Sequence, residues 1–272
     1  MKILTAISAM ALAGIFVFCG PALHAQTAAK SVPANTPIPR TADGHPDLSG
    51  IWSGPSEPGE PASLPTQYGT LRNGIVQGEW SMTPWAQAQF DYNWNPTKGI
   101  NAHSARLELN PRYAHCVPFS PVQLLGGVGA PFEILHTPKK LVIVFEDDNM
   151  VRQIYTDGRK HPDSLELTWE GNSVGHWEGN ALVVDTVGFR PETWIDDNGH
   201  VHSDKLHMVE RIQRIDFNTL QIDLTLDDPK ALEKPWTEHI FRKLRPDWDI
   251  REDVRCTEHI KTDIYGDVDS GQ

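Results

Sequence analysis

The chain has 272 residues, of which 39% are hydrophobic and 22% are charged, and its net charge at pH 7 is −12. Its 9 Trp, 9 Phe and 5 Tyr supply enough apolar surface for a folded core, so the composition excludes a disordered chain. The 24 Lys and Arg are outnumbered by 36 Asp and Glu and form no basic run, which argues against nucleic acid as a partner. One large domain is the expectation at this length.

Residues 1–25 have the pattern of a secretory signal peptide. Lys2 provides the positive start, residues 3–18 are apolar, and Ala25 is the small residue that signal peptidase requires. An uncleaved membrane anchor is the alternative, but Gly20 and Pro21 interrupt the apolar stretch and no stop-transfer charges follow. The sequence therefore predicts a periplasmic or secreted protein without membrane contact after cleavage. The mature charge is then 23 minus 36, or −13.

Two cysteines remain after cleavage, because Cys19 lies within the signal. An even pair in an exported chain favours a disulfide between Cys116 and Cys256. This bridge closes a loop of about 140 residues, which the loop-entropy relation equates with about 4–5 kcal/mol of stability. Two buried thiols are the alternative. Neither cysteine belongs to a C-x-x-C motif, so thiol redox chemistry and cysteine-ligated zinc lack their sequence pattern.

Residues 26–130 are interrupted by proline throughout and predict an irregular arm that wraps the main body. One helix is expected within the arm, near residues 84–93. Thr83 is a good N-cap, Pro84 suits the first turn, and Pro96 stops the run. The tryptophans expected to anchor the arm against the core are Trp52, Trp80, Trp85 and Trp94.

In residues 131–265 the apolar pattern changes to a period of two, which is typical of strands. The clearest example is residues 219–226, where aliphatic and polar side chains alternate. The pattern predicts about ten strands joined mostly by short turns. Their expected ranges are 132–136, 141–145, 150–155, 165–169, 173–177, 181–187, 206–215, 219–226, 237–244 and 249–258.

A meander of this kind has two exposed edges unless it closes on itself. The sequence therefore predicts a mainly β fold, an antiparallel up-and-down β-barrel of the lipocalin or fatty-acid-binding-protein type with room for one small ligand. A β-sandwich is the alternative. No internal repeat is present, which argues against a propeller or a solenoid.

Residues 199–211 hold the densest cluster of titratable side chains in the chain. His200 and His202 have the i, i+2 spacing of the two imidazoles that bind metal in a cupin. A cupin places a carboxylate about four or five residues later, whereas Leu206 and His207 occupy that place here. We therefore expect neither a metal nor another cofactor.

The candidate catalytic residues are His202, His207, Glu210 and Arg211. Strand alternation places His207 and Arg211 on one face about 13 Å apart, with Glu210 on the other face, where it acts only if that face lines the cavity. In a barrel mouth, a histidine with a pKa of about 6.5 transfers protons and an arginine stabilises an oxyanion. The alternative is a structural role: a surface turn at His202, packing at His207, and ion pairs of Glu210 with Arg211 or Arg214.

Several strings resemble those of a functionally undescribed family of exported proteins from environmental Gram-negative bacteria. These strings are Asp-Leu-Ser-Gly-Ile-Trp at 47–52, the stretch at 175–189 with Trp-Glu-Gly and Leu-Val-Val-Asp-Thr, the histidine-rich stretch at 202–211, Asp-Asp-Pro at 227–229 and Pro-Trp at 235–236. The resemblance covers most of the mature chain. It implies export and a shared fold, and it transfers no activity.

The H-E-x-x-H, P-loop and dinucleotide-binding motifs are missing from the sequence. We expect an exported enzyme that binds a small organic molecule, aromatic or sugar-derived, in the barrel cavity and acts as a lyase, isomerase or hydrolase. In this hypothesis His202 or His207 transfers the proton and Arg211 stabilises developing negative charge. A non-catalytic periplasmic ligand-binding barrel is the alternative, and a structural envelope protein is a third reading.

Overall fold

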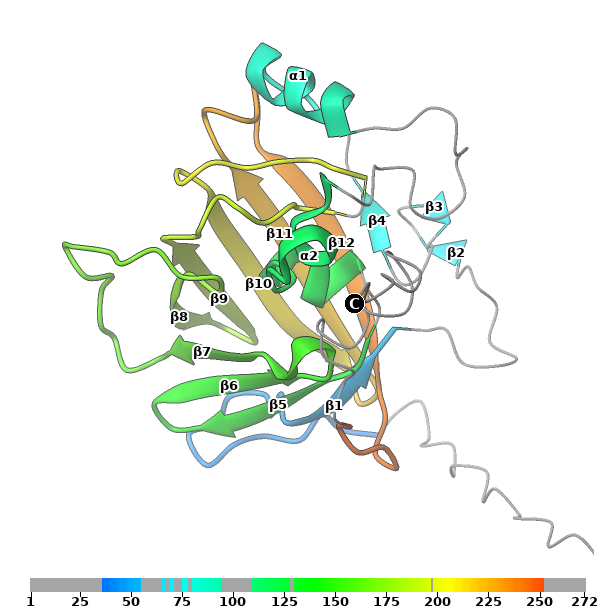
Figure 1. Cartoon of the computed structure of the whole chain (residues 1–272). Coiled ribbons are helices and arrows are strands. Elements are labelled where there is room, and N and C mark those ends of the chain that lie inside the picture. The colour runs from blue at the N-terminus through cyan, green and yellow to red at the C-terminus, as the bar shows by residue number, and fades with distance from the viewer. Residues whose placement is uncertain are drawn as a thin grey trace, which may run out of the picture. The chain divides into compact units, whose positions relative to one another are not determined.

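The computed structural model describes residues 36–54, 65–66, 69–70, 75–77, 80–93, 109–127, 130–196 and 198–251. Nine strands close into a barrel, because β12 pairs with β1 as well as with β11 (Figure 1). In order around the barrel, the strands are β1 (Gly50–Ser53), β5 (Phe132–Thr137), β6 (Lys140–Phe145), β7 (Val151–Tyr155), β8 (Asn172–Glu178), β9 (Ala181–Val187), β10 (His207–Asp216), β11 (Thr219–Asp227) and β12 (Trp236–Leu244). The predicted mainly β barrel is thus confirmed.

The remaining described elements are short. They are β2 (Pro65–Thr66), β3 (Gly69–Thr70), β4 (Ile75–Gln77), α1 (Pro84–Asn93), α2 (Pro111–His115), the π-helix η3 (Gln123–Gly127) and the 3-10 helix η4 (Asp147–Asn149). Strand β2 pairs with β3, and β4 pairs with β12 at residues 238–240. In the part of the chain that the structure describes, no helix has the length and apolar character needed to cross a membrane.

The barrel differs from an all-antiparallel meander at one seam, where β7 and β8 run parallel. The connection at 156–171 must therefore return along the length of the barrel before β8 begins. Strand β7 pairs with β6 and β8, and β8 pairs with β7 and β9, so neither strand has a free edge with which this connection could pair. The predicted strand at 165–169 is accordingly wrong: Thr168 makes a single bridge with Phe189, and Leu165 and Leu167 are 36% and 40% exposed.

The predicted N-terminal arm contributes one wall of the barrel. Residues 50–53 form β1, which pairs with β5 on one side and β12 on the other, and Trp52 is fully buried. Gly50 allows this close approach, because its φ is +129° and an added Cβ would lie 2.7 Å from the side chain of Leu244. The predicted helix is confirmed as α1, where the Thr83 hydroxyl accepts a hydrogen bond from the Ala86 amide at 3.3 Å.

Four predictions from the sequence fall wholly or partly on undescribed residues, and one of them is the anchoring role of Trp94. The predicted signal at 1–25 lies outside the described chain, as does most of the predicted strand at 249–258. Cys116 ends α2 in a left-handed conformation with φ 54°, but Cys256 lies outside the described residues. The disulfide therefore stays a prediction.

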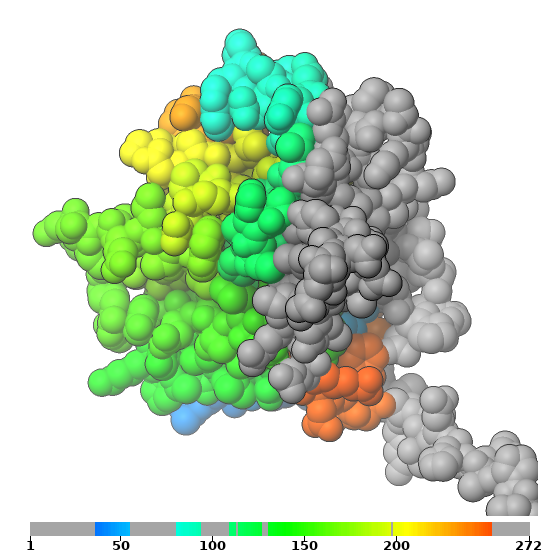
Figure 2. Space-filling view, viewed as in Figure 1, coloured from blue at the N-terminus to red at the C-terminus, as the bar shows by residue number. Residues whose placement is uncertain are grey.

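The two ends of the barrel differ in their connections. The tight turns β5–β6, β8–β9 and β10–β11 share one end, which we call the hairpin end, whereas the longer connections 188–206 and 228–235 share the opposite end, the loop end. The segment before β1, blue at the bottom of Figure 1, lies at the hairpin end, where Arg40 donates to Asn180 Oδ1 at 3.3 Å. At the loop end, α1 packs on the chain near residue 200, as the cyan and yellow surfaces in Figure 2 show, and Asn93 donates to the Gly199 carbonyl at 3.0 Å.

The barrel interior is occupied by one continuous core. Apolar side chains from the strands pack together with four residues of the segment that leads into and through η3: Phe119, Val122, Leu124 and Leu125. Arg242 of β12 is fully buried and donates to the carbonyls of Leu125 and Gly126, which fixes this segment inside. Much of the space that the sequence assigns to a ligand is therefore filled by the chain itself.

Candidate functional site

The structure places His207 and Arg211 on the outer surface of β10, with side chains 39% and 43% exposed. Their neighbours Met208, Glu210 and Ile212 are fully buried. The apolar members of that alternating pattern must face the core, which turns the other set towards solvent. The prediction that His207 and Arg211 face a shared lumen is therefore wrong.

On the outer surface, His207 belongs to a polar cluster around Asp185 of β9. Asp185 Oδ2 lies 3.0 Å from His207 Nε2, and Oδ1 lies 2.8 Å from His161 Nε2. Partial burial raises the pKa of Asp185, but the hydrogen bonds from the two imidazoles outweigh it and hold that pKa below its ordinary value. Arg211 donates to Glu178 Oε2 at 2.9 Å. These are contacts between partly exposed side chains on the outer surface of the barrel. No group of three or more His, Cys, Asp and Glu in the described ranges is arranged to hold a metal ion.

Glu210 faces the interior, where it forms a buried ion pair with Arg152 of β7. Arg152 Nη1 donates to Glu210 Oε1 at 2.9 Å, and Nη2 donates to Oε2. The same guanidinium donates to Ser173 Oγ at 3.1 and 3.2 Å and to Thr186 Oγ1 at 3.0 Å. Arg152 therefore joins β7 to β8, β9 and β10 from inside, and each charge needs the other because neither has access to water.

A second carboxyl, Glu170, lies close to this ion pair without sharing its hydrogen bonds. Both carboxyl oxygens of Glu170 are buried, and none of the described residues hydrogen-bonds to them. Burial, against the attraction of Arg152 and with smaller contributions from Glu210 and Asp148, raises the pKa of Glu170 to about 7. Glu170 is thus a strongly perturbed acid beside the Arg152–Glu210 ion pair, and of these three residues the sequence analysis named only Glu210 as a candidate.

His202 is a buried residue of the loop end rather than a surface one. Its Nδ1 lies 3.0 Å from the Ser203 carbonyl, so Nδ1 carries the proton and Nε2 accepts from the Thr193 hydroxyl at 2.7 Å. Burial lowers the pKa of His202 below its ordinary value. A small pocket of about 210 Å³ beside Trp85 of α1 reaches His202, but both ring nitrogens are already engaged. These contacts favour a structural role.

The pocket with the clearest chemical character opens at the hairpin end of the barrel. It has a volume of about 520 Å³, which lies within the range of small-molecule sites. We call it the hairpin-end pocket. Its lining residues are Thr41, Ala42, Asp43, Asp47, Ser49, His136, Thr137 and Pro138.

His136 is the titratable base of this pocket. It follows Phe132 and Ile134 on the inward face of β5, and its side chain is only 5% exposed. Its Nδ1 is buried without a hydrogen-bond partner among the described residues and lies 3.9 Å from Asp47 Oδ1. Burial lowers the pKa of His136 below its ordinary value of 6.5, although Asp47 and Asp43 act in the opposite direction. The imidazole is therefore neutral at pH 7.

Asp47 is held beside His136 by two independent contacts. Its Oδ1 accepts a hydrogen bond from the Ser49 amide at 2.9 Å, and its backbone carbonyl accepts one from Arg214 Nη1 at 2.7 Å. Arg214 comes from the hairpin end of β10, donates through Nε to the Phe217 carbonyl at 3.0 Å, and lies over the ring of Trp52. Asp47 precedes β1 and is therefore fixed to the barrel through Arg214 of β10.

The turn at residues 41–45 forms the outer side of the pocket. The Thr41 hydroxyl donates to Asp43 and lowers the pKa of that carboxyl, so Asp43 is ionised at neutral pH. The Thr41 amide donates to the His45 carbonyl at 2.9 Å, which closes the turn. The His45 ring then stacks on Trp177 of β8 at 4.5 Å between ring centroids. These contacts tie the outer side of the pocket to the barrel.

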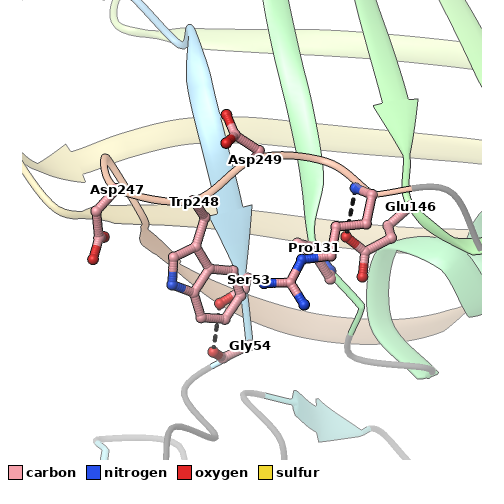
Figure 3. A pocket seen from close by; sticks show the side chains of 8 residues that line it. Ser53, Gly54, Pro131, Glu146, Asp247, Trp248 and Asp249 are labelled. Atoms are coloured by element: carbon pink, nitrogen blue, oxygen red, sulfur yellow. Dashed lines mark hydrogen bonds between the residues drawn. The ribbon is translucent and has the colours of Figure 1, made fainter. Parts of the chain in front are cut away.

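A further pocket of about 470 Å³ lies beside the end of β1, where residues 247–251 fold back (Figure 3). The indole of Trp248 lies next to Ser53 and Gly54, while the carboxylates of Asp247 and Asp249 point in different directions from it (Figure 3). Because its acidic groups diverge instead of converging on one position, this pocket is a weaker candidate than the hairpin-end pocket.

Sequence reasoning missed both His136 and Asp47. The signal for His136 was present, because it occupies the third inward position of a strand whose other inward residues are Phe132 and Ile134. A polar residue on the apolar face of a strand must be either satisfied or functional. No local pattern reveals Asp47, which lies 89 residues earlier (136 minus 47) and reaches His136 only through the fold.

Comparison of the chain with protein-family models, with curated proteins and with solved structures found no match. The likeness to lipocalins and the resemblance to exported bacterial proteins therefore stay predictions.

Proposed function

We propose that this protein is an exported enzyme that performs acid–base chemistry on a small organic molecule in the hairpin-end pocket. His136 accepts a proton from the bound molecule, and Asp47 stabilises the imidazolium that forms. The observation that carries the proposal is the neutral imidazole of His136, with a buried unpartnered Nδ1 3.9 Å from the Asp47 carboxylate, in the wall of a 520 Å³ pocket. Export rests on the signal pattern of residues 1–25.

The chemistry follows from the protonation states of the two residues. A neutral imidazole accepts protons at pH 7, whereas an imidazolium does not. The ring gains positive charge when the proton arrives, and a carboxylate beside Nδ1 stabilises that charge and orients the ring. Asp47 needs to approach Nδ1 by roughly 1 Å to form a hydrogen bond, and such bonds are often long before a ligand binds. Nε2 is then the nitrogen that meets the ligand.

Proton removal from carbon is the first step of many eliminations and isomerisations, so the proposed class is lyase or isomerase. Hydrogen exchange detects this step without knowledge of the product. The protein is incubated in D₂O with a panel of small aromatic ketones and aldose sugars, and the loss of each C–H signal beside the carbonyl is followed by NMR. We expect at least one compound to exchange faster with the protein than in buffer alone.

Two histidine variants make the experiment specific. His136→Gln removes the proposed base and is expected to reduce exchange to the buffer rate, while circular dichroism confirms that the variant is folded. His176→Gln is the matched control, because His176 is 66% exposed on β8 and does not line the pocket. Two results contradict the proposal. One is exchange that persists in His136→Gln, and the other is the absence of exchange in every compound with the wild-type protein. A compound that shifts the His136 NMR signal without exchanging identifies a ligand-binding barrel instead.

A further inference from the structure

We infer that the ligand of the hairpin-end pocket carries a positively charged amine. This inference rests on the proposed function and adds the substrate class. It depends on three features of the pocket: the carboxylates that line it, the hydrogen bonds that Arg40 and Arg214 form beside it, and the unpartnered nitrogen of a nearly buried histidine.

Two carboxylates and a neutral base are the ionisable groups that line the pocket. Asp43 and Asp47 are the carboxylates, His136 is the base, and none of the lining residues is a lysine or an arginine. A concave surface lined by one sign of charge concentrates its electrostatic field within the cavity. A cation entering this pocket is therefore attracted, and an anion is repelled.

Two arginines beside the pocket direct their hydrogen bonds to groups other than these side-chain carboxylates. Arg40 donates through Nη1 to the Gly44 carbonyl at 2.7 Å and through Nη2 to Asn180 at 3.3 Å. Arg214 donates to the backbone carbonyls of Asp47 and Phe217. Arg214 therefore holds main-chain carbonyls, whereas Arg40 holds one main-chain carbonyl and one side-chain amide oxygen. The side-chain oxygens of Asp47 are left to the pocket, where that side chain is 34% exposed.

The histidine distinguishes this pocket from a chance group of surface acids. His136 is 5% exposed, and its Nδ1 has no hydrogen-bond partner among the described residues. Buried polar atoms without partners are uncommon in folded proteins and call for a physical explanation. A ligand that carries an amine supplies one: the amine draws the Asp47 carboxylate into a defined position, from which that carboxylate reaches Nδ1, and the C–H bond beside the carbonyl of the same ligand lies at the other nitrogen.

Three probes of the same size and different charge test the inference: benzylamine, benzyl alcohol and benzoate. Binding is followed through the ring signals of His136 in protein labelled at histidine, with the signal assigned by its loss in His136→Gln. We expect benzylamine to shift this signal at concentrations at least about tenfold lower than benzyl alcohol, which corresponds to about 1.4 kcal/mol, and benzoate to leave it unchanged. High salt should weaken benzylamine binding, because it screens the attraction.

A pair of charge variants locates the effect. Asp43→Asn is expected to weaken benzylamine binding severalfold, while Asp163→Asn, which removes the same charge from an exposed residue of the 156–171 connection, should not change it.

Each other result has a defined meaning. Equal or tighter binding of benzyl alcohol or benzoate, unchanged benzylamine binding in Asp43→Asn, or no response of His136 to benzylamine would overturn the inference. If hydrogen exchange that depends on His136 is observed together with any of these results, the proposed function stands and only the inference of a positively charged substrate is rejected. If no exchange that depends on His136 is observed with the wild-type protein, the proposed function is contradicted, whichever probe binds.

Discussion

The substitution Glu170→Gln should stabilise the protein at alkaline pH and have little effect under acidic conditions. Glutamine has the shape of a protonated glutamate and cannot ionise, so it preserves the packing beside the Arg152–Glu210 ion pair. In the wild-type protein, ionisation of Glu170 places a second buried carboxylate next to a single guanidinium. The substitution removes that event and leaves the ion pair unchanged.

The expected magnitude follows from the pKa of Glu170, which rises from 4.5 to about 7 on folding. Each pKa unit corresponds to about 1.4 kcal/mol, so the folded protein resists this ionisation by about 3 kcal/mol more than the unfolded chain does. The folded state holds the proton more tightly, so wild-type stability falls as the pH rises from about 4.5 to about 7 and then levels off. Glu170→Gln should match the wild type near pH 4.5 and exceed it by up to about 3 kcal/mol at pH 8.

Urea denaturation followed by tryptophan fluorescence measures this difference at half-unit steps of pH. Other buried acids also titrate in this range, but they contribute equally to both proteins and cancel in the difference. Glu166→Gln is the matched control, because Glu166 is an exposed acid four residues earlier in the same connection. A stability difference that stays constant between acidic and alkaline pH, or that favours the wild type at pH 8, would refute the assignment of Glu170 as a buried acid held neutral.

Two further predictions concern other interior positions. Gly171→Ala should lower the free energy of unfolding by about 1–3 kcal/mol, because φ is +67° and the new Cβ would lie 2.8 Å from the Thr186 side chain. Gly158 has a φ of +82° with open space around it, so Gly158→Ala should lower the free energy of unfolding less in the same urea assay. Burial raises the pKa of Glu238 to about 8, so wild-type stability falls between pH about 4.5 and about 8. Glu238→Gln should therefore melt above the wild type at pH 9, and an equal or lower melting temperature would argue against a neutral Glu238.

Local alternation was sufficient to locate most strands of the barrel. The ranges predicted for β5, β6, β9 and β11 agree with the structure to within one residue, because side-chain direction in a strand depends only on its own sequence. Pairing between distant strands has no such local record. The parallel seam between β7 and β8 and the closure of the barrel by β1 therefore could not be derived from periodicity, and the range at 165–169 was assigned to a strand that has no partner.

The candidate site was harder to predict than the strands for a related reason. Alternation correctly separated His207 and Arg211 from Glu210, but the polar set was assigned to the cavity when the apolar set on the same strand had to face inward. Glu210 is tolerated inside because Arg152, 58 residues earlier, neutralises it. That pairing depends on the tertiary structure, as does the contact of Asp47 with His136. The density of titratable residues along the sequence is thus a poor guide to a functional site when the partners of each residue come from distant strands.

The filled interior favours the hairpin end over the centre of the barrel as the place for the proposed ligand site. Emptying the centre would withdraw the Leu125 and Gly126 carbonyls from the buried guanidinium of Arg242. A buried donor that loses its acceptor costs about 1–3 kcal/mol, and more when the group is charged. It would also expose the apolar side chains of Leu124 and Leu125, each of which is at most 2% exposed. A ligand in the hairpin-end pocket would displace none of these contacts. It would lie beside the imidazole of His136 and the carboxylates of Asp43 and Asp47, which line that pocket.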